Sequence, residues 1–159
     1  MFNSKGFLNN QSSHNQNLFP VNVFISKNLS DNEIIDACIQ LFSLSEKDIC
    51  VTQDITIEMP DYIQLLCEKE SIQGDFKILL SLYPQNDLIE QSIGKIGDEI
   101  AIAKKFADYF HCQCMVADNS PFEDYEEDLY FLVKDTSNNV QKIYINLDQI
   151  DDNIYTIQN

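Results

Sequence analysis

The 159-residue sequence has little of what catalytic sites are usually built from. It contains two histidines, four glycines and no tryptophan. A cysteine nucleophile needs a base within hydrogen-bond reach, and the sequence contains only two histidines that could act as one, His14 and His111. Four glycines leave little material for a glycine-rich phosphate loop. We therefore expect a protein that is not an enzyme, has no catalytic residues and needs no cofactor.

Signals for export or membrane insertion are missing as well. The N-terminus has no basic region followed by an apolar run and a small-residue cleavage site. No stretch approaches the length of a transmembrane helix. The five cysteines form an odd, scattered set, whereas a disulfide framework would be denser and paired. The sequence predicts a cytoplasmic protein with reduced thiols.

Negative charge dominates the composition of the chain. Twenty-six acidic residues stand against ten basic ones, which gives a net charge of -16 and a pI near 4.1. Such a field repels phosphate backbones and anionic lipid, so we expect neither nucleic acid nor a membrane as a partner. It attracts basic proteins. The alternative interpretation is that the charge serves solubility alone.

The order of apolar residues indicates one folded domain. Residues 1–19 are rich in Asn, Gln and Ser and are predicted to be a flexible leader, and 20–159 a single domain. Val21 to Ile25 has the alternation of a strand. Ser30 and Glu33 have the spacing of a capping box, which predicts a helix that ends near Ser43. Further elements are expected at 49–59 (strand), 61–69 (short helix), 76–82 (central strand), 97–110 (helix), 112–117 (strand), and 129–134 with 140–147 (hairpin).

These elements predict an α+β fold. Its centre would be a mixed, mostly antiparallel sheet of about five to six strands, covered by two main helices. Gly94 and Gly97 precede the second main helix and are interpreted as turn residues, because the full spacing of a phosphate loop is absent.

The sequence from His111 to Cys114 is the only Cys/His cluster. A zinc site needs four ligands, and no second pair follows at a comparable spacing. We expect no metal site here. The negative charge of the chain is expected to raise thiol pKa values and so to disfavour a cysteine nucleophile.

An acidic run with aromatic residues inside it is the best candidate for a binding site. It lies between two predicted strands, from 118 to 128, and holds no basic residue. A solvated loop and a calcium site are alternatives, although the acids do not follow the spacing of an EF-hand loop. Carboxylates around aromatic anchors suit a basic protein partner. The candidate residues are Asp118, Phe122, Glu123, Asp124, Tyr125, Glu126, Glu127 and Asp128. A smaller acidic group, Asp148, Asp151 and Asp152, would extend the same face if the hairpin folded back beside the run.

The segment from Gly74 to Leu147 resembles the layout of small bacterial immunity proteins from polymorphic-toxin and contact-dependent inhibition systems. The resemblance lies in Gly74-Asp75-Phe76 before an apolar strand, Asp98-Glu99-Ile100-Ala101 at a helix start, Asp118-Asn119-Ser120-Pro121 after a strand, and Tyr130-Phe131-Leu132-Val133 in the hairpin. It implies a cytoplasmic inhibitor that occludes a cognate toxin domain, often a basic nuclease.

Three functions remain open at this stage. The first is an immunity protein that neutralises a basic toxin domain by occlusion, as a monomer or a homodimer. The second is a small acidic secretion chaperone that holds a segment of an effector. The third is a small enzyme with a carboxylate pair among Asp54, Glu58 and Asp75.

Overall fold

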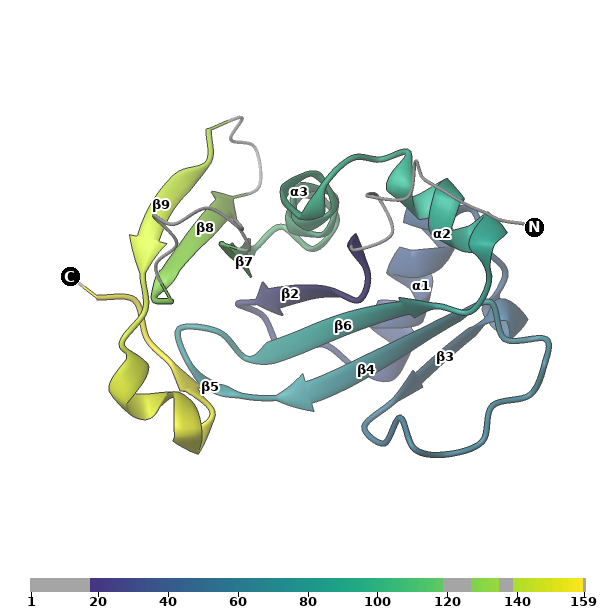
Figure 1. Ribbon diagram of the computed structural model, residues 1–159, viewed down its shortest axis with the longest axis horizontal. Helices are drawn as coiled ribbons and strands as arrows, with labels where there is room; N and C mark the ends of the chain where they lie inside the picture. Colours follow the sequence, from purple (N-terminus) through teal and green to yellow (C-terminus); the bar gives the residue numbers. More distant parts are fainter. Residues whose placement is uncertain (1–17, 119–126, 135–138, 159) are drawn as a thin grey trace, which may run out of the picture.

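The computed structural model describes residues 18–118, 127–134 and 139–158. These residues form one large sheet and the helices that cover it. Within these residues seven strands lie in the order β3-β4-β6-β2-β7-β8-β9 (Figure 1). Only β3 and β4 pair in parallel, and the other neighbours are antiparallel. This confirms the α+β class and the mixed, mostly antiparallel sheet. The strands are β2 (Val21–Ile25), β3 (Ile49–Thr52), β4 (Leu65–Ser71), β6 (Ile78–Pro84), β7 (Gln113–Ala117), β8 (Leu129–Lys134) and β9 (Gln141–Tyr144).

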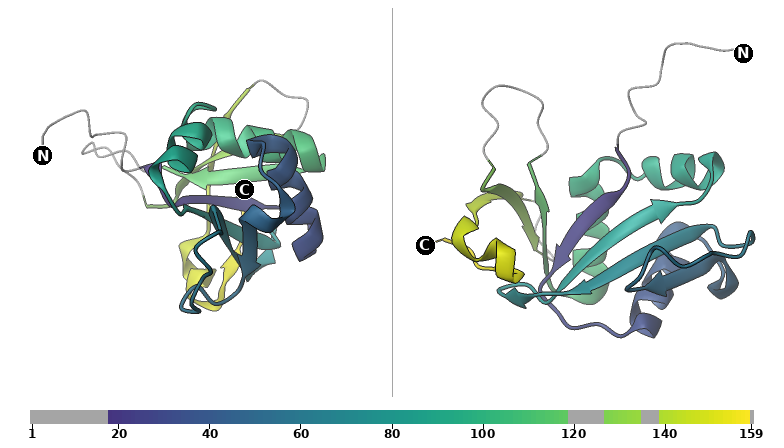
Figure 2. Two further views of the ribbon diagram at one scale, coloured as in Figure 1. Left: turned by 90° about the vertical axis from the view of Figure 1, so that its right-hand side faces the viewer. Right: turned by 60° about the horizontal axis from the view of Figure 1, so that its bottom comes forward.

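Among the described residues, three α-helices pack on one face of the sheet: α1 (Asp31–Phe42), α2 (Asp87–Gly94) and α3 (Glu99–Phe110) (Figures 1 and 2). The two main helices, α1 and α3, confirm the prediction. Helix α2 was not predicted. The Asn86 side chain caps it by accepting from the backbone N–H of Ile89, and its buried contact with the core is Ile93.

The main core lies between the helices and the sheet. Alternate residues of the strands, such as Val23, Leu80 and Cys67, point toward Ile34 on α1 and Phe106 on α3, and all five are fully buried. This is the period-two and period-3.6 patterning expected where helices cover one sheet face. Leu18 and Phe19, which end the segment predicted as a leader, also pack against this core.

A second, smaller core covers part of the opposite face. It contains Phe24, Phe76, Met115 and Ile145, and the C-terminal segment packs over it through side chains that include Tyr155. This segment comprises the 3-10 helix η3 (Leu147–Asp152) and the short strand β10 (Ile154–Tyr155), which pairs in parallel with β5 (Gln73–Gly74). The part of this face formed by β3, β4 and the adjoining stretches of β6 and β2 lies outside the second core.

Two sequence predictions are wrong in this region. The strand expected at 49–59 ends at Thr52, because Thr52, Asp54 and Thr56 hydrogen-bond among themselves and compete with strand pairing. The short helix expected at 61–69 is instead β4, which pairs with β3 on one side and β6 on the other.

With β4 counted, the sheet has seven strands, one more than the five to six that the sequence predicted. The last strand is also shorter than the expected 140–147.

Candidate protein-binding site

The acidic run from 118 to 128 connects β7 to β8. Phe122, Glu123, Asp124, Tyr125 and Glu126 lie outside the described residues, so the predicted role of these five stays a prediction. Asp118 and Asp128 are half-buried and Glu127 is exposed. These three acids mark the two ends of the run.

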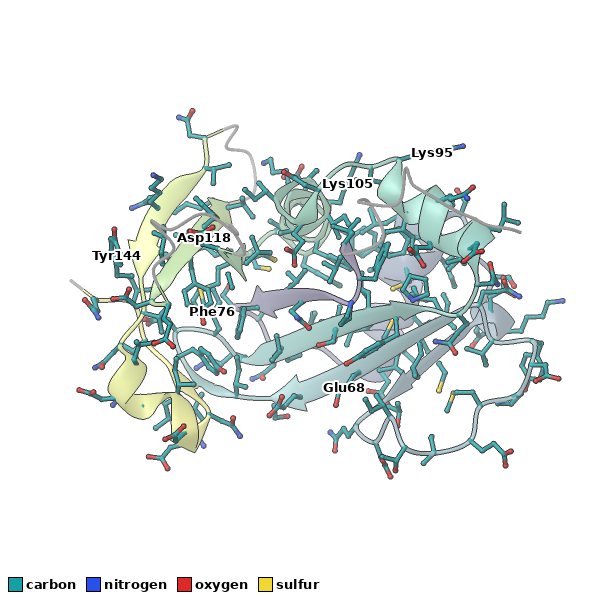
Figure 3. All side chains as sticks on the ribbon, viewed as in Figure 1. Glu68, Phe76, Lys95, Lys105, Asp118 and Tyr144 are labelled. Atoms are coloured by element: carbon teal, nitrogen blue, oxygen red, sulfur yellow. The ribbon has the colours of Figure 1, made fainter. Side chains whose placement is uncertain are left out.

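Backbone hydrogen bonds fix those ends. The N–H of Asp118 donates to the carbonyl of Leu129 at 3.0 Å, and the carbonyl of Asp128 accepts from the N–H of Ile145 at 2.9 Å. Leu129 pairs with Tyr144 across β8 and β9. The run therefore leaves and re-enters the fold where β7 ends, β8 begins and β9 ends, a region marked in Figure 3 by Asp118 and Tyr144.

The second acidic group follows β9 and starts at the same end of these strands. Its residues, Asp148, Asp151 and Asp152, lie in η3 and are exposed. The side chain of Asn146 caps η3 by accepting from the N–H of Asp148 at 3.1 Å. Because Ile145 is hydrogen-bonded to Asp128, the second acidic group starts three residues beyond the point where the run re-enters the sheet. We call the described part of this region the acidic end: Asp118, Glu127, Asp128, Asp148, Asp151 and Asp152.

No lysine accompanies the acidic end in the sequence. None occurs between Lys105 and Lys134, and none follows Lys142. In the fold Lys77 comes near the segment that carries the second group, because its ammonium group donates to the carbonyl of Gly74 at 3.0 Å and Gly74 pairs with Tyr155. Because like charges gathered at one end of a domain repel one another, this region is suited to a cationic surface.

The Cys/His cluster has a different geometry from that of a metal site. His111 ends α3 in the left-handed conformation and is exposed, whereas Cys112 is half-buried and Cys114 buried. Within the described residues no group of three or more His, Cys, Asp or Glu side chains is placed to hold a metal ion.

The prediction that the negative charge of the chain raises thiol pKa values is wrong for Cys112, and at Cys50 and Cys114 the main cause of the rise is burial. Burial raises the pKa of Cys50 and of Cys114. Hydrogen bonds from Cys114 and Ser26, with the positive charge of Lys27 nearby, lower the pKa of Cys112. Local hydrogen bonds outweigh the long-range field at this thiol because they act at contact distance.

The carboxylates considered for an enzyme are spread over the surface. Asp54 and Glu58 are exposed on the connection between β3 and β4, and the pKa of Asp54 is lowered by hydrogen bonds from Thr56, whereas a general acid needs a raised value. The Asp75 carboxylate accepts from the N–H of Ile157 at 2.8 Å. A cavity of about 250 Å³ lies elsewhere, between α3 and the β8–β9 hairpin, and is lined by residues that include Lys104 and Val140.

Comparisons with family models, with curated proteins and with solved structures give no match to this chain. Within the described ranges, no helix combines the length and the apolar character needed to cross a bilayer.

Proposed function

We propose that this protein binds a basic protein partner and inhibits it by occlusion, in the manner of an immunity protein that neutralises a toxin domain. The observation that carries the proposal is the acidic end, where an acidic group that follows β9 begins beside the ends of the acidic run, in stretches of the sequence that contain no lysine. The resemblance in layout to immunity proteins points the same way.

The physical role of these carboxylates is to attract and orient the partner. A surface of one sign raises the association rate with an oppositely charged protein and penalises wrong partners. Carboxylates can also occupy the place of substrate phosphates on a basic nuclease. Exposed carboxylates contribute little affinity by themselves, so buried contacts must supply the remainder.

The test begins with the partner that binds the tagged full-length chain in its native host. The partner and this protein are purified separately, and one is titrated into the other in a calorimeter at low and at physiological ionic strength. The proposal expects one-to-one binding of a basic protein, affinity that falls as salt rises, and loss of the partner's own activity on binding. An acidic partner, or an affinity indifferent to salt, would overturn it.

Two charge reversals localise the site. Glu127→Lys changes the acidic end, and Asp36→Lys makes the same change in charge at an exposed position in the middle of α1. We expect Glu127→Lys to weaken binding several-fold more than Asp36→Lys. Equal effects would show that net charge acts without a defined site.

A further inference from the structure

The connection from β3 to β4, residues 53–64, carries large apolar side chains that are exposed to solvent. Ile55 is 40% exposed, Ile57 45% and Tyr62 61%. Ile55 and Ile57 continue the alternating pattern of β3, yet they lie beyond its end at Thr52. Large apolar groups gathered on one connection favour contact with another molecule more than isolated exposed residues do.

The sheet next to this connection presents an open polar face. Strand register aligns Thr52, Glu68, Ser81 and Asn22 side by side across β3, β4, β6 and β2. Their neighbours in sequence, such as Leu80 and Cys67, face the helices, so this row lies on the opposite side. Figure 3 shows Glu68 on that side, and Figure 1 shows no described helix over these strands.

Hydrogen bonds order this row. The Ser81 hydroxyl lies 2.6 Å from Oδ1 of Asn22, and the Tyr83 hydroxyl lies 3.3 Å from Oε1 of Glu68. Ser81 is only 5% exposed, although none of the described helices lies over it. A preordered row of this kind loses little side-chain entropy when a partner docks.

The charge of the connection identifies the chemistry of the partner. Its charged residues are Asp54, Glu58 and Asp61, all exposed, and Glu70 on β4 is exposed as well. Lys69 of β4 points to the helix side, where it pairs with Asp31. A second copy of this chain would bring carboxylates against carboxylates, so self-association is disfavoured.

We propose that the connection 53–64 and the open face beside it form a second docking surface for a protein. Its occupant is a basic protein with an apolar depression that accepts Ile55, Ile57 and Tyr62, ringed by cations that meet Asp54, Glu58 and Asp61. The surface lies toward the β3 edge of the sheet, whereas Asp118, Glu127 and Asp128 lie where β7 ends and β8 begins, beyond β2. The inference rests on the proposed function only in that the partner is a basic protein.

Site-specific photocrosslinking in the native host tests it. The photoreactive residue p-benzoylphenylalanine replaces Ile57, Glu127 or Leu88 in the full-length chain; Leu88 on α2 is the control, at 74% exposure. We expect Ile57 to yield a discrete crosslink to a basic protein that Leu88 does not give. Crosslinks from Glu127 alone would overturn this second surface and leave the proposed function standing. A basic protein crosslinked from Ile57 alone would reject the acidic end instead, and the absence of any crosslink from either position rejects both.

Once the crosslinked partner has been identified and purified, its binding affinity for variants of this protein can be measured. The variant Ile55→Ser/Ile57→Ser is expected to lose about tenfold or more in affinity, as for buried interface anchors. Leu88→Ser should bind as the unmodified chain does. Urea unfolding of both variants should match the unmodified chain, because these side chains are exposed. Unchanged affinity in the double variant would overturn the inference.

Discussion

Gly74 lies against the backbone carbonyl of Tyr155, so closely that a Cβ atom at position 74 would stand 2.5 Å from that oxygen. Gly74 also has a φ of +101°, a conformation that other residues rarely adopt. The two residues pair in the small parallel sheet of β5 and β10. The C-terminal segment that covers the second core is thus held at a point that only glycine fits.

Gly74→Ala is therefore expected to destabilise the fold. Backbone strain alone costs about 1–3 kcal/mol, and the steric clash with Tyr155 adds to it. Urea unfolding measures the change. Gly94→Ala is the matched control: a Cβ there meets nothing within 4 Å, and alanine suits the last turn of α2, so this variant should be as stable as the unmodified chain or slightly more stable. Equal behaviour of the two variants would show that the C-terminal segment is not held as described.

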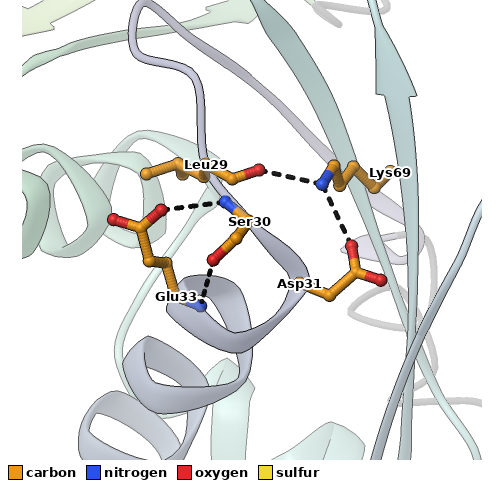
Figure 4. A network of polar contacts seen from close by, with 5 residues as sticks. All are labelled: Leu29, Ser30, Asp31, Glu33 and Lys69. Atoms are coloured by element: carbon orange, nitrogen blue, oxygen red, sulfur yellow. Dashed lines mark hydrogen bonds and ion pairs between the residues drawn. The ribbon is translucent and has the colours of Figure 1, made fainter.

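Lys69 links the sheet to the start of α1. Its ammonium group donates to the carbonyl of Leu29 at 2.8 Å and to the carboxylate of Asp31 at 3.0 Å (Figure 4). Lys69→Met keeps the apolar stem and removes both bonds, which we expect to cost about 1–3 kcal/mol. Asp31→Asn removes only the charge of an exposed partner and should cost less than about 1 kcal/mol. Chemical denaturation of both variants checks this order, and a larger loss in Asp31→Asn would contradict it.

Local signals allowed α1 to be predicted from the sequence. Its start depends on two residues three positions apart, Ser30 and Glu33, whose reciprocal hydrogen bonds form the capping box. It ends where Ser43 adopts the left-handed conformation. The capping box needs no knowledge of the remaining chain, because it is satisfied within one helical turn.

The errors concern residues whose state depends on distant contacts. Ile55 and Ile57 have the alternation of a strand but lie beyond the pairing of β3 with β4, which extends only to Thr52 and Glu68. In β4, Lys69 interrupts the apolar alternation, because it turns to the helix side to reach Leu29. A charged residue with a specific distant partner cannot be recognised from spacing alone.

The candidate site was predictable only in part. Composition and the run around Asp118 and Asp128 indicated an acidic surface. That Asp148 begins the second group at the same end of the sheet follows from the pairing of Leu129 with Tyr144, which a linear pattern does not specify. The exposure of Ile57 depends in the same way on where strand pairing stops.

The lowered pKa of Glu33 predicts that the free energy of unfolding depends on pH. Hydrogen bonds from the backbone and side chain of Ser30 lower the pKa of Glu33 in the folded chain. Its contribution is therefore fully present above the unfolded pKa of about 4.3 and is lost as the pH falls through the lower, folded value. An NMR titration should give Glu33 a midpoint below that of the unfolded chain. The stability advantage over Glu33→Gln should shrink over the same acidic range, and an advantage that is constant with pH would contradict the assignment.

Cys112 should be the most reactive thiol of the folded protein. Cys38, Cys67 and Cys114 are buried, whereas Cys112 and Cys50 are both partly exposed. The pKa of Cys112 is lowered, chiefly by the hydrogen bond from Cys114, while burial raises that of Cys50. Since the thiolate is the nucleophile, Cys112 should be alkylated first at neutral pH.

Alkylation with iodoacetamide, followed by peptide mass spectrometry, measures this order. The rate at Cys112 should rise with pH at a lower midpoint than the rate at Cys50. Ser26→Ala removes a hydrogen bond to Cys112 and should move its midpoint upward. In urea the five cysteines should react at similar rates, because unfolding removes these differences. If Cys50 reacted before Cys112 in the folded chain, the hydrogen-bonded environment of Cys112 would not lower its pKa as the structure indicates.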